Sequence, residues 1–198
     1  MKCNTLGELL YWSYANLQMM DAAQSMGLTD YNRTCFIIRS KAYKAYKDSV
    51  WHIHDLLQEN VAKMRSDNTH CAYCNREFSP NELTIEHIFP RIKGGTNDMD
   101  NILLVCSHCN SSKGDMDVME WYATIRRDFP PKFVLLHYLK QINNYAEEHH
   151  LLETPLSELN TRLLPFDYDR QQQKVLTQSL KNTDTTDANA IIRIFLAE

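Results

Sequence analysis

The chain is poor in glycine and proline and has no long apolar run. Only five of its 198 residues are glycine and six are proline, so most of the chain offers few places for tight turns. The longest uninterrupted apolar run, Ile102 to Cys106, is far shorter than the roughly 20 residues of a membrane-spanning helix. Glu8 interrupts the apolar stretch near the N-terminus, which argues against a signal peptide. These absences predict a soluble, cytoplasmic protein.

Helical spacing dominates both ends of the chain. Its length and a hydrophobic content of 43% suit one domain with additions or two small domains. Apolar residues recur at helical spacing from Thr5 to Gly27, and a second helix is predicted from Asn32 to about Arg65. We expect these two helices to form a hairpin. A further helix is predicted after Pro130-Pro131, through Phe133 to Tyr145.

The C-terminal region gives the weakest signals. Pro155 and Pro165 indicate irregular connections. The polar stretch from Lys181 to Asp187 predicts a loop, and Ala188 to Ala197 predicts a short closing helix.

Four of the six cysteines form two Cys-x-x-Cys pairs. They are Cys71, Cys74, Cys106 and Cys109. A two-residue spacer lets neighbouring thiolates bend onto one ion, and two such pairs are what a tetrahedral zinc site needs. In a reducing compartment such pairs are more often metal ligands than disulfides, so we predict a structural Zn²⁺. Cys3 and Cys35 lie outside this framework, and we expect both to be small packing residues.

Between the two pairs the apolar pattern shortens to that of strands. Leu83 to Ile88 predicts one strand and Ile102 to Val105 predicts a second. A helix is predicted from Ser107 to about Trp121, beginning beside the second cysteine pair. Three of the five glycines also fall in this region, where tight turns would need them: Gly94, Gly95 and Gly114.

The segment from Cys71 to Gly114 carries polar residues suited to chemistry. Glu86 precedes His87 at the end of the first predicted strand, and Asn101 precedes the second. Asn110 follows the last cysteine. In this order, the stretch CAYCNREFSPNELTIEHIFPRIKGGTNDMDNILLVCSHCNSSKG resembles the HNH endonucleases that have a ββα-metal core. The resemblance covers under a quarter of the chain.

The resemblance implies an α+β, mostly helical fold. A ββα-metal core with structural zinc would be flanked by the N-terminal helical hairpin and by C-terminal helices. The domains expected on this basis are an N-terminal helical region at 1–66, the HNH core at 67–120 and a C-terminal helical region at 121–198.

The resemblance also implies a role for each polar residue. Glu86 and Asn110 would bind a catalytic divalent ion, because both offer the hard oxygen atoms that Mg²⁺ or Mn²⁺ prefers. His87 would be the general base that activates water, since imidazole accepts protons near neutral pH. Asn101 would hold the reactive loop through backbone hydrogen bonds and so aim His87.

Two positions depart from the commonest pattern of the family. Glu86 stands where aspartate is more usual, so the ligand arm is one methylene longer. Asn110 stands where histidine is common, and its neutral oxygen favours Mg²⁺ or Mn²⁺ over Zn²⁺.

Basic residues near this site are candidates for substrate binding. Arg91 and Lys93 occupy the turn directly after His87, where phosphate contacts are expected. Lys113 lies three residues after Asn110, on nearly the same helical face. It either contacts a phosphate or is a solvated surface lysine.

A second basic stretch lies in the second predicted helix. Lys41, Lys44 and Lys47 recur at three-residue spacing beside Tyr43 and Tyr46. One interpretation is a strip that contacts phosphates. The other is an amphipathic helix with solvated lysines and a packed aromatic stripe.

The chain as a whole lacks the positive charge that nucleases often carry. It has 21 lysines and arginines against 25 aspartates and glutamates, a formal net charge of -4. Proteins that find nucleic acid unaided usually present a basic face that displaces counterions from phosphates. Either the basic residues are gathered in a local patch, or another molecule brings the chain to its substrate.

These observations predict a metal-dependent HNH endonuclease that hydrolyses phosphodiester bonds in DNA or RNA. Small, acidic HNH proteins with helical flanks resemble effector nucleases of prokaryotic anti-phage defence systems, in which a companion ATPase or other regulatory protein controls cleavage. The alternative is a non-catalytic zinc module that binds nucleic acid or protein. Such a module would need the four cysteines but not Glu86, His87 and Asn110 together.

Overall fold

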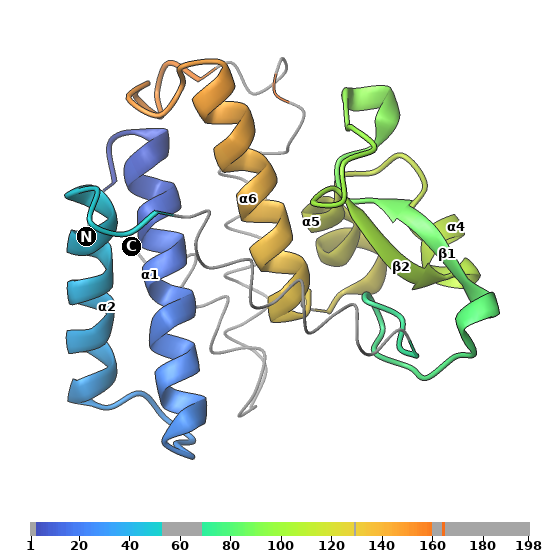
Figure 1. Cartoon of the computed structure of the whole chain (residues 1–198), viewed down its shortest axis with the longest axis horizontal. Coiled ribbons are helices and arrows are strands. Elements are labelled where there is room, and N and C mark those ends of the chain that lie inside the picture. The colour runs from blue at the N-terminus through green and yellow to red at the C-terminus, as the bar shows by residue number, and fades with distance from the viewer. Residues whose placement is uncertain (1–2, 53–68, 129, 160–163, 165–198) are drawn as a thin grey trace. The chain divides into compact units, whose positions relative to one another are not determined.

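The structure falls into two compact units (Figure 1). It is a computed structural model that describes residues 3–52, 69–128, 130–159 and 164. Residues 3–52 and 143–159 form what we call the helical unit, and residues 69–142 form the sheet unit. Helices predominate, and the named strands of the described residues are one pair in the sheet unit. The predicted α+β, mostly helical fold is therefore confirmed.

The helical unit is built on a hairpin of two helices, α1 (Leu6–Ser25) and α2 (Arg33–Lys47). Thr5 begins α1, because its hydroxyl accepts a hydrogen bond from the backbone N–H of Glu8 at 3.2 Å. The carboxylate of Glu8 accepts in return from the backbone N–H of Asn4 at 2.9 Å. This reciprocal capping satisfies N–H groups that the first helical turn leaves without a partner.

The hairpin buries aromatic and small apolar side chains. Tyr14 and Tyr46 are both buried, with ring centroids 5.9 Å apart. Cys35 is fully buried beside Met19, as expected of a packing residue, whereas Cys3 is only half-buried.

The second helix ends well before Arg65, where the sequence predicted its end. Ser49 adopts a left-handed φ of 55°, and the backbone N–H of Val50 donates to the carbonyl of Ala45 at 2.9 Å. Hydrogen bonds of this kind across a left-handed residue are a common helix ending. Residues 53–65 of the predicted helix lie outside the described part of the chain.

The sheet unit contains the predicted ββα arrangement. Its strands are β1 (Leu83–His87) and β2 (Ile102–Cys106), which pair antiparallel, and α4 (Ser107–Lys113) follows. Two short 3-10 turns, η2 (Pro80–Glu82) and η3 (Arg91–Lys93), precede and follow β1.

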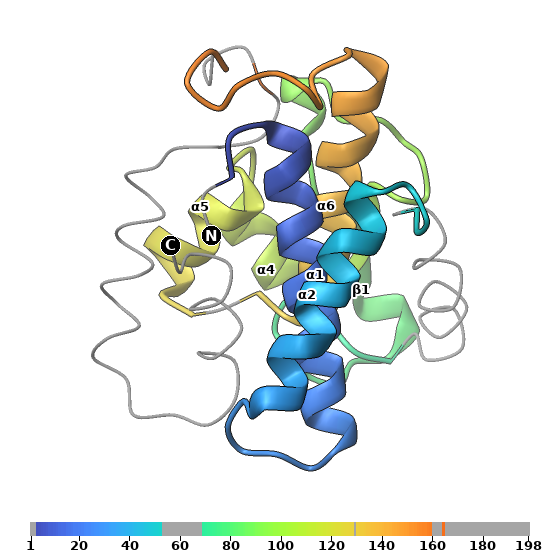
Figure 2. The same ribbon diagram turned by 90° about the vertical axis from the view of Figure 1, so that its left-hand side faces the viewer.

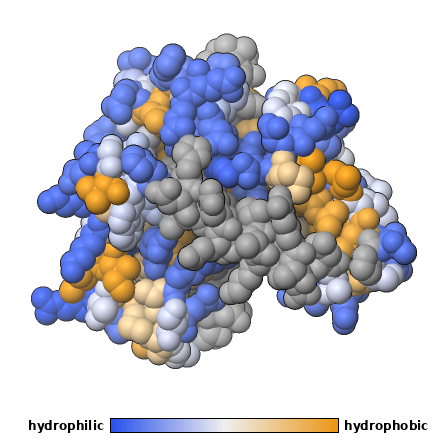
Figure 3. Space-filling model, in the orientation of Figure 1, coloured by the Kyte–Doolittle hydropathy of each residue, from blue (hydrophilic) through white to orange (hydrophobic). Residues whose placement is uncertain are grey.

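Alternation along β1 gives the sheet two unlike faces. Thr84 and Glu86 point to the face covered by α4, where their side chains contact that helix. Ile85 points the other way and is 62% exposed. Ile85 pairs with Leu104 of β2, and Figure 3 shows hydrophobic side chains at the surface near the two strands.

The helix predicted from Ser107 to Trp121 is broken in two. Gly114 ends α4 with φ 52° and ψ -131°, a backbone conformation that side chains with a Cβ rarely adopt. A new helix, α5 (Val118–Trp121), begins at Asp117, whose side chain accepts hydrogen bonds from the next helical turn. A π-helical turn, η4 (Tyr122–Arg126), continues from it.

The last helix among the described residues, α6 (Lys132–Glu148), begins after Pro130-Pro131 as the sequence predicted. Its residues up to Ile142 belong to the sheet unit, and those from Asn143 belong to the helical unit. The helix is thus shared by both units.

Beyond α6 the chain returns to α1 within the helical unit. The backbone N–H of Gly7 donates to the carbonyl of Leu152 at 2.8 Å. A Cβ at Gly7 would lie 2.9 Å from that oxygen, so this close approach favours glycine. The structure predicted for the chain from Pro165 onward lies outside the described residues. In the described part, no helix combines the length and the apolar character needed to cross a membrane.

Candidate zinc centre and nuclease site

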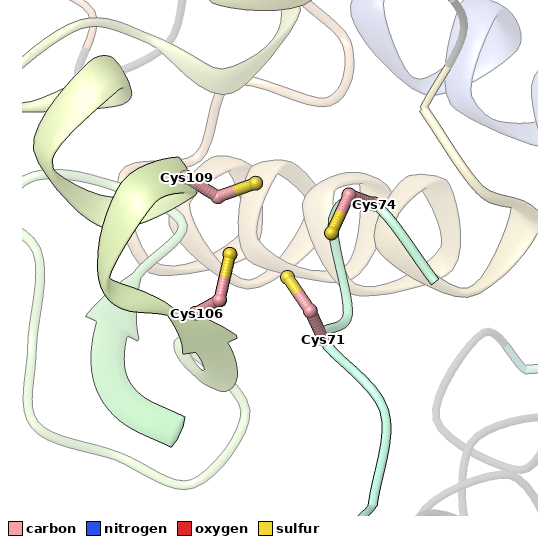
Figure 4. Close-up of side chains that lie close together, drawn as sticks. All are labelled: Cys71, Cys74, Cys106 and Cys109. Carbon is pink, nitrogen blue, oxygen red and sulfur yellow. The ribbon is translucent and has the colours of Figure 1, made fainter. Parts of the chain in front are cut away.

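The four paired cysteines converge in the sheet unit. Their sulfur atoms all lie within 4.8 Å of one another, and Figure 4 shows them turned toward a common centre. Cys71 and Cys74 come from the loop before β1, Cys106 ends β2 and Cys109 lies in α4. A tetrahedral zinc ion with Zn–S bonds of about 2.3 Å needs sulfurs about 3.8 Å apart. The four side chains therefore fit a zinc ion with small movements.

Backbone hydrogen bonds fix the first cysteine pair against β2. The N–H of Ala72 donates to the carbonyl of Leu104 at 2.9 Å, and the N–H of Asn75 donates to the carbonyl of Cys71 at 2.8 Å. Asn75 adopts a left-handed φ of 54°, which asparagine tolerates better than most residues. The loop is thereby closed directly after Cys74.

The surroundings of the four cysteines disfavour negative charge that is not compensated. Burial, a hydrogen bond with Cys106 and the neighbouring sulfurs raise the pKa of the Cys109 thiol. The guanidinium of Arg126 donates to Cys109 Sγ at 3.9 Å and lies 5.6 Å from the centroid of the Trp121 ring. Four thiolates around Zn²⁺ carry two net negative charges, which a neighbouring guanidinium would offset.

Asn101 holds the loop after β1 together. It is fully buried, and its side-chain oxygen accepts from the backbone N–H of Phe89 at 2.8 Å. Its amide nitrogen donates to the carbonyls of Phe89 at 3.1 Å and of Thr96 at 2.8 Å. A Cβ at Gly95 would lie 1.8 Å from the Phe89 carbonyl oxygen, so the loop also needs glycine there. The side chain of Asn101 therefore ties Phe89 to Thr96 across the loop.

Replacing Asn101 with alanine is expected to lower the free energy of unfolding of the sheet unit by about 3 kcal/mol, because buried backbone groups lose their partners. Urea denaturation followed by fluorescence would measure the change. Asn81, an exposed asparagine in η2, provides the matched control, and its replacement by alanine should change stability by less than about 0.5 kcal/mol. Equal effects of the two substitutions would contradict the proposed anchoring.

Glu86 and Lys113 form a buried ion pair between β1 and α4. Lys113 Nζ lies 2.5 Å from Glu86 Oε1 and donates to the carbonyl of His87 at 3.0 Å. The side chain of Lys113 is fully buried and that of Glu86 is 8% exposed. Lys113 is therefore not the solvated surface lysine that the sequence left open. Because one carboxylate oxygen of Glu86 is engaged, Oε2 is the oxygen available to a metal ion.

Asn110 lies on the same covered face of β1. Its amide nitrogen donates to the hydroxyl of Thr84 at 3.0 Å and to the carbonyl of Ile85 at 3.1 Å. With both N–H groups engaged, the carbonyl oxygen Oδ1 is the atom that can face a ligand. A metal-binding role for Asn110 would use this oxygen.

His87 follows Glu86 but projects from the opposite face of β1. Its Nε2 lies 3.0 Å from the side-chain oxygen of Asn97, a residue that the sequence analysis did not single out. Because a carbonyl oxygen only accepts, this orientation puts the hydrogen on Nε2 and leaves the lone pair on Nδ1. Within the described residues, no hydrogen bond or ion pair joins the ring to Glu86 or Asn110.

Arg91 and Lys93, the other predicted substrate-binding residues, are exposed on η3. Among the ion pairs of the described residues, neither takes part. Gly94 ends this turn with a φ of 91°, a conformation that favours glycine. Both cations are thus available to solvent directly after β1.

Asp100 and two residues of α6 hold the loop from outside, and no sequence pattern indicated these contacts. Lys140 Nζ lies 2.6 Å from Asp100 Oδ2, and His137 Nδ1 lies 3.0 Å from the backbone oxygen of Asp100. Asp100 directly precedes Asn101, so α6 anchors the chain at the residue that organises the loop. Contacts between residues some 40 positions apart leave no local pattern in a sequence.

Comparison with known proteins finds a family match for part of the sheet unit. Residues 71–118 match the family described as HNH endonuclease. We call these residues the HNH segment. The HNH segment contains the four cysteines and Glu86, His87, Asn101 and Asn110. The helical unit and α6 lie outside it.

Two curated relatives share parts of this region. Over 59 residues the chain is 36% identical to the CRISPR-associated endonuclease Cas9 of Corynebacterium diphtheriae, which is 29% of this chain and 5% of that protein. Over 92 residues it is 28% identical to the SPbeta prophage-derived putative HNH endonuclease YoqL of Bacillus subtilis, which is 41% of this chain and 38% of that protein. The chain thus spans well under half the length of either relative. No solved structure matches it.

Proposed function

We propose that this chain is a metal-dependent endonuclease that hydrolyses phosphodiester bonds in DNA or RNA. The observation that supports it most is the loop held by Asn101, because it places His87 at the end of β1 within a matched HNH segment. A zinc module without catalysis would not need a buried asparagine to organise the loop beside a histidine.

In this proposal His87 is the general base. Its Nδ1 takes a proton from the attacking water, and Asn97 holds the ring through Nε2. The exposed cations Arg91 and Lys93 bind phosphates on either side of the cleaved bond. The products would carry a 5′-phosphate and a 3′-hydroxyl, as the chemistry of the family implies.

Glu86 Oε2 and Asn110 Oδ1 would hold the catalytic Mg²⁺ or Mn²⁺. Both are hard oxygen donors and share the covered face of β1. A divalent ion bound there supplies positive charge to the phosphate oxygens. Lys113 keeps Glu86 oriented through its ion pair and adds a second positive charge nearby.

The four cysteines would hold a structural Zn²⁺ that joins the loop before β1 to the end of β2 and to α4. The zinc ion stabilises the fold in this proposal and takes no part in the reaction.

Cleavage should depend on a divalent ion and on one class of substrate. The purified chain would be incubated with Mg²⁺ or Mn²⁺ and with plasmid DNA, single-stranded DNA and structured RNA in turn. We expect at least one substrate to be cut, EDTA to abolish cleavage, and excess Mg²⁺ to restore it. Cleavage that continues in EDTA would contradict the metal dependence, and intact substrates under every condition would contradict nuclease activity of the chain alone.

For the biological role, we propose a nuclease subunit of an anti-phage defence system, located in the cytoplasm and controlled by a companion ATPase or another regulatory protein. The net charge of -4 supports a requirement for help in reaching nucleic acid. Co-purification of the chain with a protein encoded beside it would test the partner.

A further inference from the structure

Positive charge is concentrated on α2. Five of the 21 lysines and arginines lie in its 15 residues, and no aspartate or glutamate does. The remaining 16 cationic side chains are set against 25 acidic ones. A chain that is acidic overall therefore has one strongly basic helix, and polyanions would be attracted to that helix first.

Three of these cations line one side of the helix. Arg33, Lys41 and Lys44 are exposed, and within the described part of the chain none of them forms an ion pair. Their spacing of eight and three residues keeps them within one face, about 16 Å from first to last at about 1.5 Å per residue. Lys47, by contrast, is paired with Glu8 at 2.8 Å.

The opposite side of α2 packs against α1, so the side that carries the three cations remains exposed to solvent. Ala42, Tyr43 and Tyr46 are buried, and Tyr43 meets the Trp12 ring of α1 edge-on at 5.6 Å. The aromatic stripe is thus a packing stripe, as one of the two sequence interpretations held. Figure 2 shows α2 in front of α1, with its outer side toward the viewer.

Arg39 differs from these three cations, because it lies on the packed side of α2 and stacks on aromatic rings there. Its guanidinium lies 4.4 Å from the centroid of the Trp12 ring and 5.1 Å from that of Phe36. Phe36 is 43% exposed. Exposed aromatic rings are surfaces on which bases stack, and Phe36 lies one helical turn from Arg33.

We propose that Arg33, Lys41 and Lys44, with Phe36 beside Arg33, form a nucleic-acid docking face that binds the phosphate backbone of the substrate. The inference rests on the nuclease function proposed above. A strand of duplex rises about 3.4 Å per phosphate, so the 16 Å face spans about five phosphates.

Exposed acidic residues lie at both ends of this face, and the positive charge of the face favours a polyanionic ligand. Asp30 precedes α2 and Asp48 follows it, and both are exposed. The cations between them carry the charge that a polyanion would neutralise. An acidic protein surface would match the sign of this charge too, but the match of residues 71–118 to HNH endonucleases favours nucleic acid.

The test measures binding in a chain that cannot cleave. In a His87→Ala background, Lys41→Gln with Lys44→Gln would be compared with Arg76→Gln with Arg127→Gln, which removes the same charge from exposed residues of the sheet unit. Glutamine and lysine have similar helix propensities, so α2 should remain folded; circular dichroism would check this. Fluorescence anisotropy with short single-stranded DNA, duplex DNA and RNA would give Kd across a range of salt concentrations.

The α2 pair should weaken binding about 10-fold or more at low salt and reduce the slope of log K against log salt by about 1.4 to 1.8, the loss of two phosphate contacts. The control pair should leave that slope unchanged. Equal slopes for the two pairs would overturn the proposal. Polyglutamate serves as a second probe, in place of an acidic protein. If the α2 pair lost binding to polyglutamate but kept its binding to nucleic acid, the face would bind an acidic protein and the proposal would be wrong. If the chain with His87 intact cuts none of the substrates, a slope change here would still support the docking face, while the nuclease activity of the chain alone would be contradicted.

Discussion

Replacing His87 with alanine is expected to lower the rate of phosphodiester cleavage by about 10² to 10⁴, the usual contribution of a general base. The loss should fall on kcat, because the ring acts on water and not on substrate binding. Single-turnover cleavage of the best substrate, with metal in excess, would measure it. Zinc content and thermal stability should match the unmodified chain, since the His87 ring lies outside the cysteine cluster.

The matched control for this substitution is His108→Ala. His108 is exposed in α4 and sits between two of the clustered cysteines without joining the cluster. Its loss should leave the cleavage rate within about twofold. If both histidine variants were equally impaired, the loss would reflect damage to the zinc centre and the role of His87 as base would be wrong.

Replacing Cys109 with serine is expected to release zinc and to unfold the sheet unit. Structural zinc contributes about 10–16 kcal/mol in small modules, more than the 5–15 kcal/mol or so by which a whole domain is usually stable. The four sulfurs join the loop before β1 to the junction of β2 and α4, so loss of one ligand should release that loop. Bound zinc would be measured by elemental analysis, and folding by the dispersion of amide NMR signals.

Cys3→Ser provides the control for a lost thiol. Cys3 is half-buried in the helical unit and lies outside the cluster. It should retain one zinc per chain and a native spectrum. A Cys109→Ser chain that remained folded with no zinc bound would show that the metal does not hold this fold together.

The sequence predicted best where the chemistry is local. The cysteine spacing brings four sulfurs within 4.8 Å, and the short apolar runs form the paired strands β1 and β2. The position of Asn101 before β2 also agrees with its hydrogen bonds to Phe89 and Thr96. In each case a spacing of few residues decides which atoms can meet.

Tertiary packing decided the features that the sequence did not reveal. Lysine is usually a surface residue, yet Lys113 is buried. It pairs with Glu86 and donates to the carbonyl of His87, which lies 26 residues earlier in β1. The break at Gly114 depends on a backbone conformation that apolar spacing does not report. Charge and periodicity cannot distinguish a lysine in solvent from one that neutralises a buried carboxylate.

The contacts of α6 determine the smallest fragment of this chain that could keep the loop after β1 folded. The Tyr138 hydroxyl donates to Asp117 at 2.9 Å, and Lys140 holds Asp100 beside the reactive loop. A fragment of residues 67–120, the extent expected for an HNH core, would lack both contacts. Such a fragment would also expose new apolar surface to solvent. Extending the fragment to Ile142 keeps every contact that α6 makes with the loop, at the cost of cutting a continuous helix in two.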